Sequence, residues 1–126
     1  MNKLKTFMMP LFFVCNMAYA NQSELNLADI KGLSLKECLD INYNKFNLYT
    51  KPGLNDKSYL FTWYSLDNKS SDKSQDLKNY IQQKTGDFYL SKPPVKNPES
   101  NMIFIMCMRF YNSQELDNYI KDNILK

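Results

Sequence analysis

Residues 102–108 read Met-Ile-Phe-Ile-Met-Cys-Met, a run without a charged or hydroxyl side chain. Such a run is either a helix that is apolar on every side or a buried β-strand, because periodicity alone does not separate the two. The preceding Asn97, Pro98 and Glu99 favour the helix, since they offer a cap, a first-turn proline and a first-turn acid. This run decides the fold class. We expect a helix, with a buried strand as the alternative.

The chain that follows this run carries the clearest local helix signal. Asn112 and Glu115 have the spacing of a capping box. Leu116, Ile120 and Ile124 then form one apolar stripe. The sequence therefore predicts a final helix capped by Asn112.

Three further helices are predicted upstream, over residues 26–46, 56–66 and 72–85. Each shows apolar side chains at helical spacing, and Cys38 falls on the core side of the first. The chain has three glycines, too few for the many turns of a β-sandwich. We therefore predict an all-α fold, a small single-domain helical bundle of about five helices with one disulfide.

Particular residues are expected to shape these upstream helices. Asn55 and Ser71 are predicted to cap the second and third helices. One face of the second helix is predicted to lie in the core as an aromatic stripe made of Tyr59, Leu60, Trp63 and Tyr64. Gly32 weakens the first helix and indicates a bend or a close packing contact there.

The first 20 residues predict a cleavable signal peptide. Lys3 and Lys5 precede an apolar run at residues 7–14, and Ala18-Tyr19-Ala20 is the small-x-small pattern that signal peptidase recognises. The apolar run is shorter than the roughly 20 residues that span a bilayer. The sequence thus favours cleavage over a retained membrane anchor.

Export defines the domain that remains. We expect cleavage after Ala20, with a lipid anchor through Cys15 as a further alternative, so that residues 21–126 form one periplasmic helical domain. The formal net charge of +3 falls by the two lysines lost, and Arg109 is the one arginine of the chain. A basic, arginine-rich patch is typical of nucleic-acid binding and is missing. We predict no nucleic-acid partner and no membrane association after cleavage.

Two cysteines remain after cleavage, Cys38 and Cys107. An even number of cysteines in an oxidising compartment favours a disulfide between them. Two free buried thiols are the alternative. A bridge would close a loop of about 70 residues, which the chain-entropy model values at roughly 4 kcal/mol.

The chemistry that the sequence lacks is informative. The chain contains no histidine, which removes Ser-His and Cys-His nucleophile pairs and histidine-based zinc sites. Glu37 with Asp40, and Asp72 with Asp76, have helical spacing that would suit paired carboxylates, but a solvated charged face is the simpler interpretation of both pairs. We predict that the protein is not an enzyme and binds no metal and no cofactor.

Two segments resemble a known family. Residues 103–117 read Ile-Phe-Ile-Met-Cys-Met-Arg-Phe-Tyr-Asn-Ser-Gln-Glu-Leu-Asp. This resembles the carboxy-terminal signature of the class-four immunity proteins against type VI secretion amidase effectors (the Tai family), in which a Met-x-Cys segment leads through an aromatic residue and a His-Ser or Asn-Ser pair to Glu-Leu-Asp. Residues 33–39 are similar to that family's first helix, which carries the partner cysteine.

The resemblance implies a periplasmic immunity protein that binds an incoming peptidoglycan amidase and blocks its active site. Amidases of this kind cut stem peptides with a Cys-His nucleophile pair. The sequence departs from the family pattern at Arg109 and at Pro93-Pro94, two places expected on the surface. The alternative function is a non-enzymatic envelope binding or accessory protein without a toxin partner.

Two surfaces are predicted to meet partners. A cleft-blocking protein needs a rigid projection, and the third helix with the proline-rich segment after it offers Asp76, Asp87, Lys92 and Lys96 as partner-binding residues. The alternative is that this segment is only a connector. Residues 102–108 offer more hydrophobic surface than a small core readily hides, which predicts a homodimer.

Overall fold

The computed structural model describes residues 24–94 and 99–126. The predicted signal peptide, its cleavage site after Ala20, and residues Lys96 and Asn97 lie outside the described residues. The helix over the apolar run begins only at Ile103 with Met102 at its cap position, so the prediction that Asn97 caps it is wrong. Within the part described, the chain forms helices and no strand. The all-α prediction is therefore confirmed.

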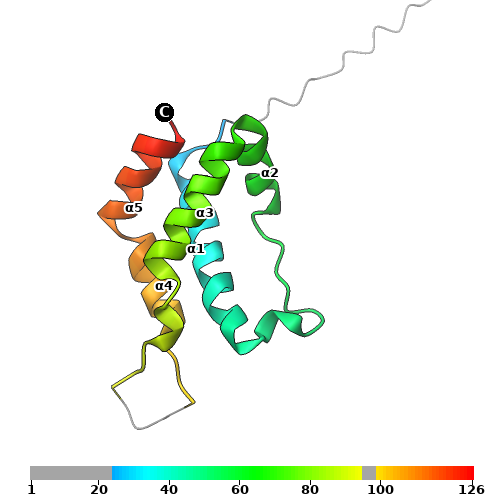
Figure 1. Ribbon diagram of the computed structural model, residues 1–126, viewed down its shortest axis with the longest axis vertical. Helices are drawn as coiled ribbons and strands as arrows, with labels where there is room; N and C mark the ends of the chain where they lie inside the picture. Colours follow the sequence, from blue (N-terminus) through cyan, green and yellow to red (C-terminus); the bar gives the residue numbers. More distant parts are fainter. Residues whose placement is uncertain (1–23, 95–98) are drawn as a thin grey trace, which may run out of the picture.

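In the described residues, five α-helices and four shorter helical segments follow one another (Figure 1). The elements are α1 Leu27–Tyr43, η1 Asn44–Phe46, η2 Leu48–Thr50, α2 Leu60–Lys69, α3 Ser71–Thr85, η3 Phe88–Leu90, α4 Ile103–Tyr111, α5 Gln114–Tyr119 and the π-helical η4 Ile120–Ile124. The apolar run at 102–108 thus lies almost entirely in α4. The strand alternative for this run is wrong.

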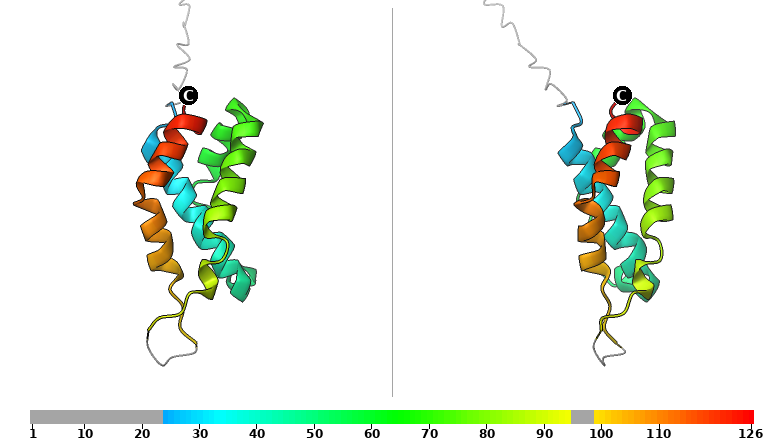
Figure 2. Two further views of the ribbon diagram at one scale, coloured as in Figure 1. Left: turned by 60° about the vertical axis from the view of Figure 1, so that its left-hand side comes forward. Right: turned by 90° about the vertical axis from the view of Figure 1, so that its left-hand side faces the viewer.

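Helix α1 forms the centre of the bundle. It packs against α3 on one side and α4 on the other, and α2 packs mainly against α3 (Figure 2). The start of α1 lies at the same end of the bundle as the carboxy terminus, and the described residues 91–94 after η3 and 99–102 before α4 lie at the opposite end (Figure 1). We call that opposite end the loop end.

The core is a set of apolar side chains contributed by all five α-helices and η4. Its buried members are Ile30, Leu33, Cys38, Leu66, Leu77, Ile81, Ile103, Cys107, Phe110, Leu116, Ile120 and Ile124. Burying a side chain of this size stabilises a fold by about 1.5–3 kcal/mol. The stripes predicted for the third and final helices are therefore core-facing, as expected.

A disulfide joins the two central helices. Cys38 of α1 and Cys107 of α4 are bonded, with sulfurs 1.99 Å and Cα atoms 5.8 Å apart, and both residues are fully buried. The predicted pairing is confirmed, and the alternative of two free thiols is wrong. The bond ties α1 to α4, the helix that contains the apolar run at 102–108.

Asn42 forms a polar cross-link at the loop end. Its Nδ2 donates hydrogen bonds to the carbonyl oxygens of Cys38 (2.9 Å) and Thr85 (2.8 Å), and its Oδ1 accepts one from the backbone N–H of Tyr89 (2.8 Å). Asn42 is fully buried. Because a buried amide without partners is costly, these bonds fix the end of α3 and the start of η3 against α1.

The second helix begins later than predicted. Asn55 does not cap it, and α2 starts at Leu60 after Tyr59, whose φ of 66° is left-handed. The cause is Asp56, whose carboxylate accepts hydrogen bonds from both the N–H (2.7 Å) and the hydroxyl (2.6 Å) of Ser58. Such side-chain turns compete with helix formation and delay the start of α2.

The aromatic stripe of the second helix is only partly in the core. Trp63 packs against the core, whereas Tyr59 is 41% and Tyr64 is 55% exposed, so the core prediction is wrong for both tyrosines. Leu66 is the buried side chain of α2. The late start of the helix changes which of its faces meets α1 and α3, so the prediction for Tyr64 is wrong.

Two predicted caps are shifted by one residue. The Ser70 side chain caps α3 by accepting from the N–H of Lys73 (3.3 Å), in place of Ser71. Ser113 caps α5 by accepting from the N–H of Leu116 (3.2 Å), in place of Asn112. Serine and asparagine serve equally well at this position, so local sequence does not choose between neighbours.

Candidate functional site

The structure separates the residues predicted to bind a partner. Asp87 and Lys92 are exposed and flank η3 at the loop end. Asp76 is exposed near the middle of α3, about 14 Å of helix axis before the end of that helix. Asp87 and Lys92 thus share one end of the bundle, and Asp76 lies on a different part of the surface.

The described residues of the loop end form an apolar surface with charges of both signs. Phe46 is 52% exposed and Leu90 is 61% exposed. Phe46 and Leu48 line a hollow of about 390 Å³ together with Lys92, Glu99 and Asn101. We call Phe46, Leu48, Leu90, Lys92 and Asn101 the loop-end surface.

Contacts behind the loop-end surface hold it in place. The Phe46 ring meets the Tyr89 ring edge-on, with centroids 6.5 Å apart, and the Lys45 ammonium lies 5.6 Å from the Tyr89 centroid. The backbone of Tyr89 is bonded in turn to buried Asn42. A surface fixed in this way loses little conformational freedom when a partner binds.

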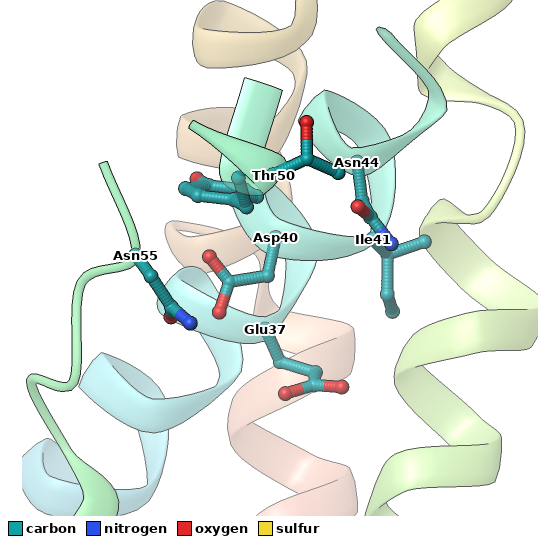
Figure 3. Close-up of a pocket in the computed structure, with 7 residues that line it drawn as sticks. Glu37, Asp40, Ile41, Asn44, Thr50 and Asn55 are labelled. Carbon is teal, nitrogen blue, oxygen red and sulfur yellow. The ribbon is translucent and has the colours of Figure 1, made fainter. Parts of the chain in front are cut away.

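A second, more polar hollow lies along α1 and is shown in Figure 3. Its volume is about 410 Å³. Three of its lining residues belong to α1, one to η1 and three to the segment that follows η1: Glu37, Asp40 and Ile41, then Asn44, and then Tyr49, Thr50 and Asn55. We call it the α1 hollow.

The carboxyls of the α1 hollow are not the solvated face that the sequence suggested. Burial, with repulsion from Asp40, raises the pKa of Glu37, against which Lys78, Lys36 and Trp63 act in part. Burial beside Asp40 raises the pKa of Tyr49 to about 12. Asp40 itself is held in an ion pair by Lys36. The interpretation of Glu37 and Asp40 as fully solvated is wrong, because residues 49–55 fold back over them.

We expect the substitution Glu37→Gln to change how stability depends on pH. A folded-state pKa above the ordinary 4.5 means that the folded protein holds this proton more tightly than the unfolded chain. Ionisation of Glu37 therefore destabilises the folded protein as the pH rises from the pKa of the unfolded chain through the raised pKa of the folded protein. The free energy of unfolding of the wild type should fall in this range relative to Glu37→Gln and stay lower at neutral pH.

Urea unfolding of both proteins between about pH 3.5 and 7 measures this difference. Asp76→Asn, which neutralises an exposed carboxylate on α3, is the matched control and should follow the wild type. Parallel curves for wild type and Glu37→Gln would show that Glu37 is not held in a desolvated site.

The α1 hollow does not assemble a metal site. Among residues 24–94 and 99–126, no group of three or more Cys, Asp or Glu side chains is placed to hold a metal ion. The Asp40 carboxylate pairs with Lys36 through one of its oxygens and lies beside Tyr49.

Other exposed apolar side chains gather on α2 and α4. Phe61 of α2 is 83% exposed, and Phe104 and Ile105 of α4 are 59% and 43% exposed. In the described part of the chain, no helix has the length and apolar character needed to cross a membrane. One side of α4 packs in the core through Ile103, Cys107 and Phe110, and the opposite side of this helix is exposed to solvent.

Comparisons with known proteins give no assignment at this point. Family models, curated proteins and solved structures were each compared with the chain, and none of them matches it. What the fold and the sites define is a small all-α protein with a disulfide-bonded core and a fixed, largely apolar surface at one end.

Proposed function

We propose that this protein is a non-enzymatic periplasmic inhibitor that binds a type VI secretion peptidoglycan amidase and blocks its active site. The observation that carries the proposal is the loop-end surface, which is exposed and apolar with the charge of Lys92 beside it, and is fixed to the bundle through Asn42 and Tyr89. The likeness of residues 103–117 to the class-four immunity proteins supports the choice of partner.

The disulfide supports the proposed compartment. Disulfides form and persist where the environment is oxidising, and Cys38–Cys107 is buried in the centre of this bundle. The predicted signal peptide would bring the chain to such a place. An inhibitor of an enzyme that cuts peptidoglycan is needed in the periplasm, where that enzyme meets its substrate.

The composition of the loop-end surface suits a protein partner. Phe46 and Leu90 offer apolar area that a partner can cover, and Lys92 adds a charge beside it. Binding energy in protein interfaces concentrates in a few large side chains surrounded by weaker contacts. We assign Phe46 and Leu90 as the two side chains that contribute most to binding of the amidase.

Gene context and co-purification test the proposal. The gene should lie beside a gene for a secreted cysteine amidase, and the two purified proteins should elute together from a size-exclusion column. Co-elution that is lost in Leu90→Asp but kept in Lys121→Glu, a distant exposed control, would place the contact at the loop end. A neighbouring amidase that elutes separately would favour the envelope accessory protein instead.

We also propose that the protein is a homodimer through the open side of α4. Phe104 and Ile105 lie next to each other on this helix and are exposed. Exposed apolar side chains that gather on one element tend to mark an interface, and symmetric dimers are the commonest assembly. A second copy would cover both side chains.

Phe104→Asp should convert the dimer into a monomer, because the new carboxylates would be buried without partners in the interface. Light scattering at tens of micromolar measures the mass. Phe61→Asp, on the still more exposed aromatic of α2, should remain a dimer. A wild type that is monomeric at this concentration would contradict the proposal.

A further inference from the structure

The chain between η2 and α2 is an exposed strap. Residues 51–59 are all exposed, yet the strap and the preceding η2 segment form the outer wall of the α1 hollow through Tyr49, Thr50 and Asn55. In Figure 1 this segment runs along the outside of the bundle and returns to α2. Its hold on α1 therefore comes from few contacts.

Tyr59, the last residue of the strap, has an unfavourable backbone conformation. Its φ of 66° and ψ of 5° are in the left-handed region, which is uncommon for a bulky side chain. Its carbonyl accepts the hydrogen bond from the N–H of Trp63 (3.0 Å) that opens α2. Such a conformation persists only where surrounding structure enforces it.

Gly32 supplies that enforcement. A Cβ atom built on Gly32 would overlap with the hydroxyl and ring atoms of Tyr59, so the phenol lies against the bare backbone of α1. The close approach predicted at Gly32 from the sequence is thus a contact with a strap residue. We call this contact the Gly32 notch.

The layer between the strap and α1 is polar. Most of its side chains are polar: the carboxyls Glu37 and Asp40, the amides Asn44 and Asn55, Tyr49 and Thr50, with Ile41 as the one apolar member (Figure 3). Helix α2 adds one fully buried side chain, Leu66, and the partly buried Trp63 to the core. Parts of a fold with few buried apolar contacts open at lower free energy than the core does. Residues 51–69 have this character, whereas α1 and α4 are bonded through the disulfide.

We propose that Tyr59 latches residues 51–69 onto α1 through the Gly32 notch. These residues open as one unit while the disulfide-bonded helices stay folded. Opening removes Asn55 and Trp63 from beside the carboxyls of α1, so the latch governs access to the α1 hollow. This conformational device is independent of the proposed inhibitor function.

Hydrogen exchange of the purified, oxidised protein tests the latch. Gly32→Ala fills the notch. Tyr59→Ala removes the phenol but keeps a residue with a Cβ atom at this left-handed position. Each should speed exchange of the α2 amides at least tenfold and leave the α1 and α4 amides near the disulfide unchanged. Trp63, the one tryptophan of the chain, should show the same opening as a shift in fluorescence.

The double variant makes the test specific. In the Tyr59→Ala background, Gly32→Ala should add no further acceleration, because the two residues act through one contact. Tyr64→Ala is the matched control: it truncates an exposed tyrosine of the same unit and should leave exchange unchanged. Unchanged α2 protection in Tyr59→Ala, or equal acceleration in every helix, would overturn the proposal. Tyr59→Ala decides the matter even where Gly32→Ala fails to fold.

Discussion

Replacing both cysteines with alanine should lower the free energy of unfolding by about 4 kcal/mol, because the bond closes a loop with a sequence separation of 69 residues. The loss should be larger if the vacated space stays unfilled, since Cys38 and Cys107 are fully buried. A domain of this size has a total stability of only about 5–15 kcal/mol, so the variant should be marginal at 37 °C.

Denaturant unfolding in the presence and absence of a reductant measures the effect. The wild type should lose stability when it is fully reduced in the unfolded state and then refolded under reducing conditions. The double alanine variant should give the same midpoint with and without reductant. A wild-type midpoint that is insensitive to complete reduction, verified by thiol alkylation, would contradict this account of the core.

The second large effect concerns the loop-end surface. Leu90→Asp combined with Lys92→Glu should weaken binding of the partner amidase by more than about 2 kcal/mol, or roughly 30-fold in Kd. Leu90 is 61% exposed and Lys92 lines the adjacent hollow, so neither substitution disturbs the core. Titration calorimetry with the amidase measures the change, and thermal melting checks the fold.

Two further variants locate the contact. Asp76→Lys probes the middle of α3, away from the loop end, and should change the affinity little. Lys121→Glu reverses an exposed charge in η4 and should have no effect. Equal affinity of the wild type and the Leu90/Lys92 variant would move the binding surface elsewhere. A large loss in Asp76→Lys alone would assign it to α3.

The sequence was sufficient to predict the disulfide and the helices that carry continuous apolar stripes. Leu77 with Ile81, and Leu116 with Ile120, repeat at four-residue spacing and are all buried. The pairing of Cys38 with Cys107 followed from an even cysteine count and a predicted export signal. These inferences depend on local pattern or on arithmetic, and neither needs the tertiary fold.

The polar cross-link at Asn42 was missed, although a signal for it exists. Asn42 continues the four-residue spacing of Ile30, Ser34 and Cys38, so the same stripe that places Cys38 in the core places the amide there. Its partners Thr85 and Tyr89 lie more than 40 residues away in the sequence. No local pattern could name them.

The α1 hollow could not be predicted for a similar reason. Glu37 and Asp40 read as a charged helix face, and the residues that shield them, such as Tyr49 and Asn55, belong to a segment without periodicity. The short turn made by Asp56 with Ser58 directs that segment, and the Gly32 notch receives its end. Whether a charged face is solvated thus depends on the path of an irregular segment.

The central claim, that this protein inhibits a peptidoglycan amidase, is tested most directly by titrating the purified, oxidised protein into the amidase encoded by the neighbouring gene. The measured quantity is hydrolysis of a peptidoglycan stem peptide. We expect amidase activity to fall to zero at a fixed stoichiometric ratio of the wild-type protein. The Leu90→Asp/Lys92→Glu variant at the same ratio should leave most of the amidase activity intact. Full amidase activity in the presence of a large excess of the folded wild-type protein would contradict the claim.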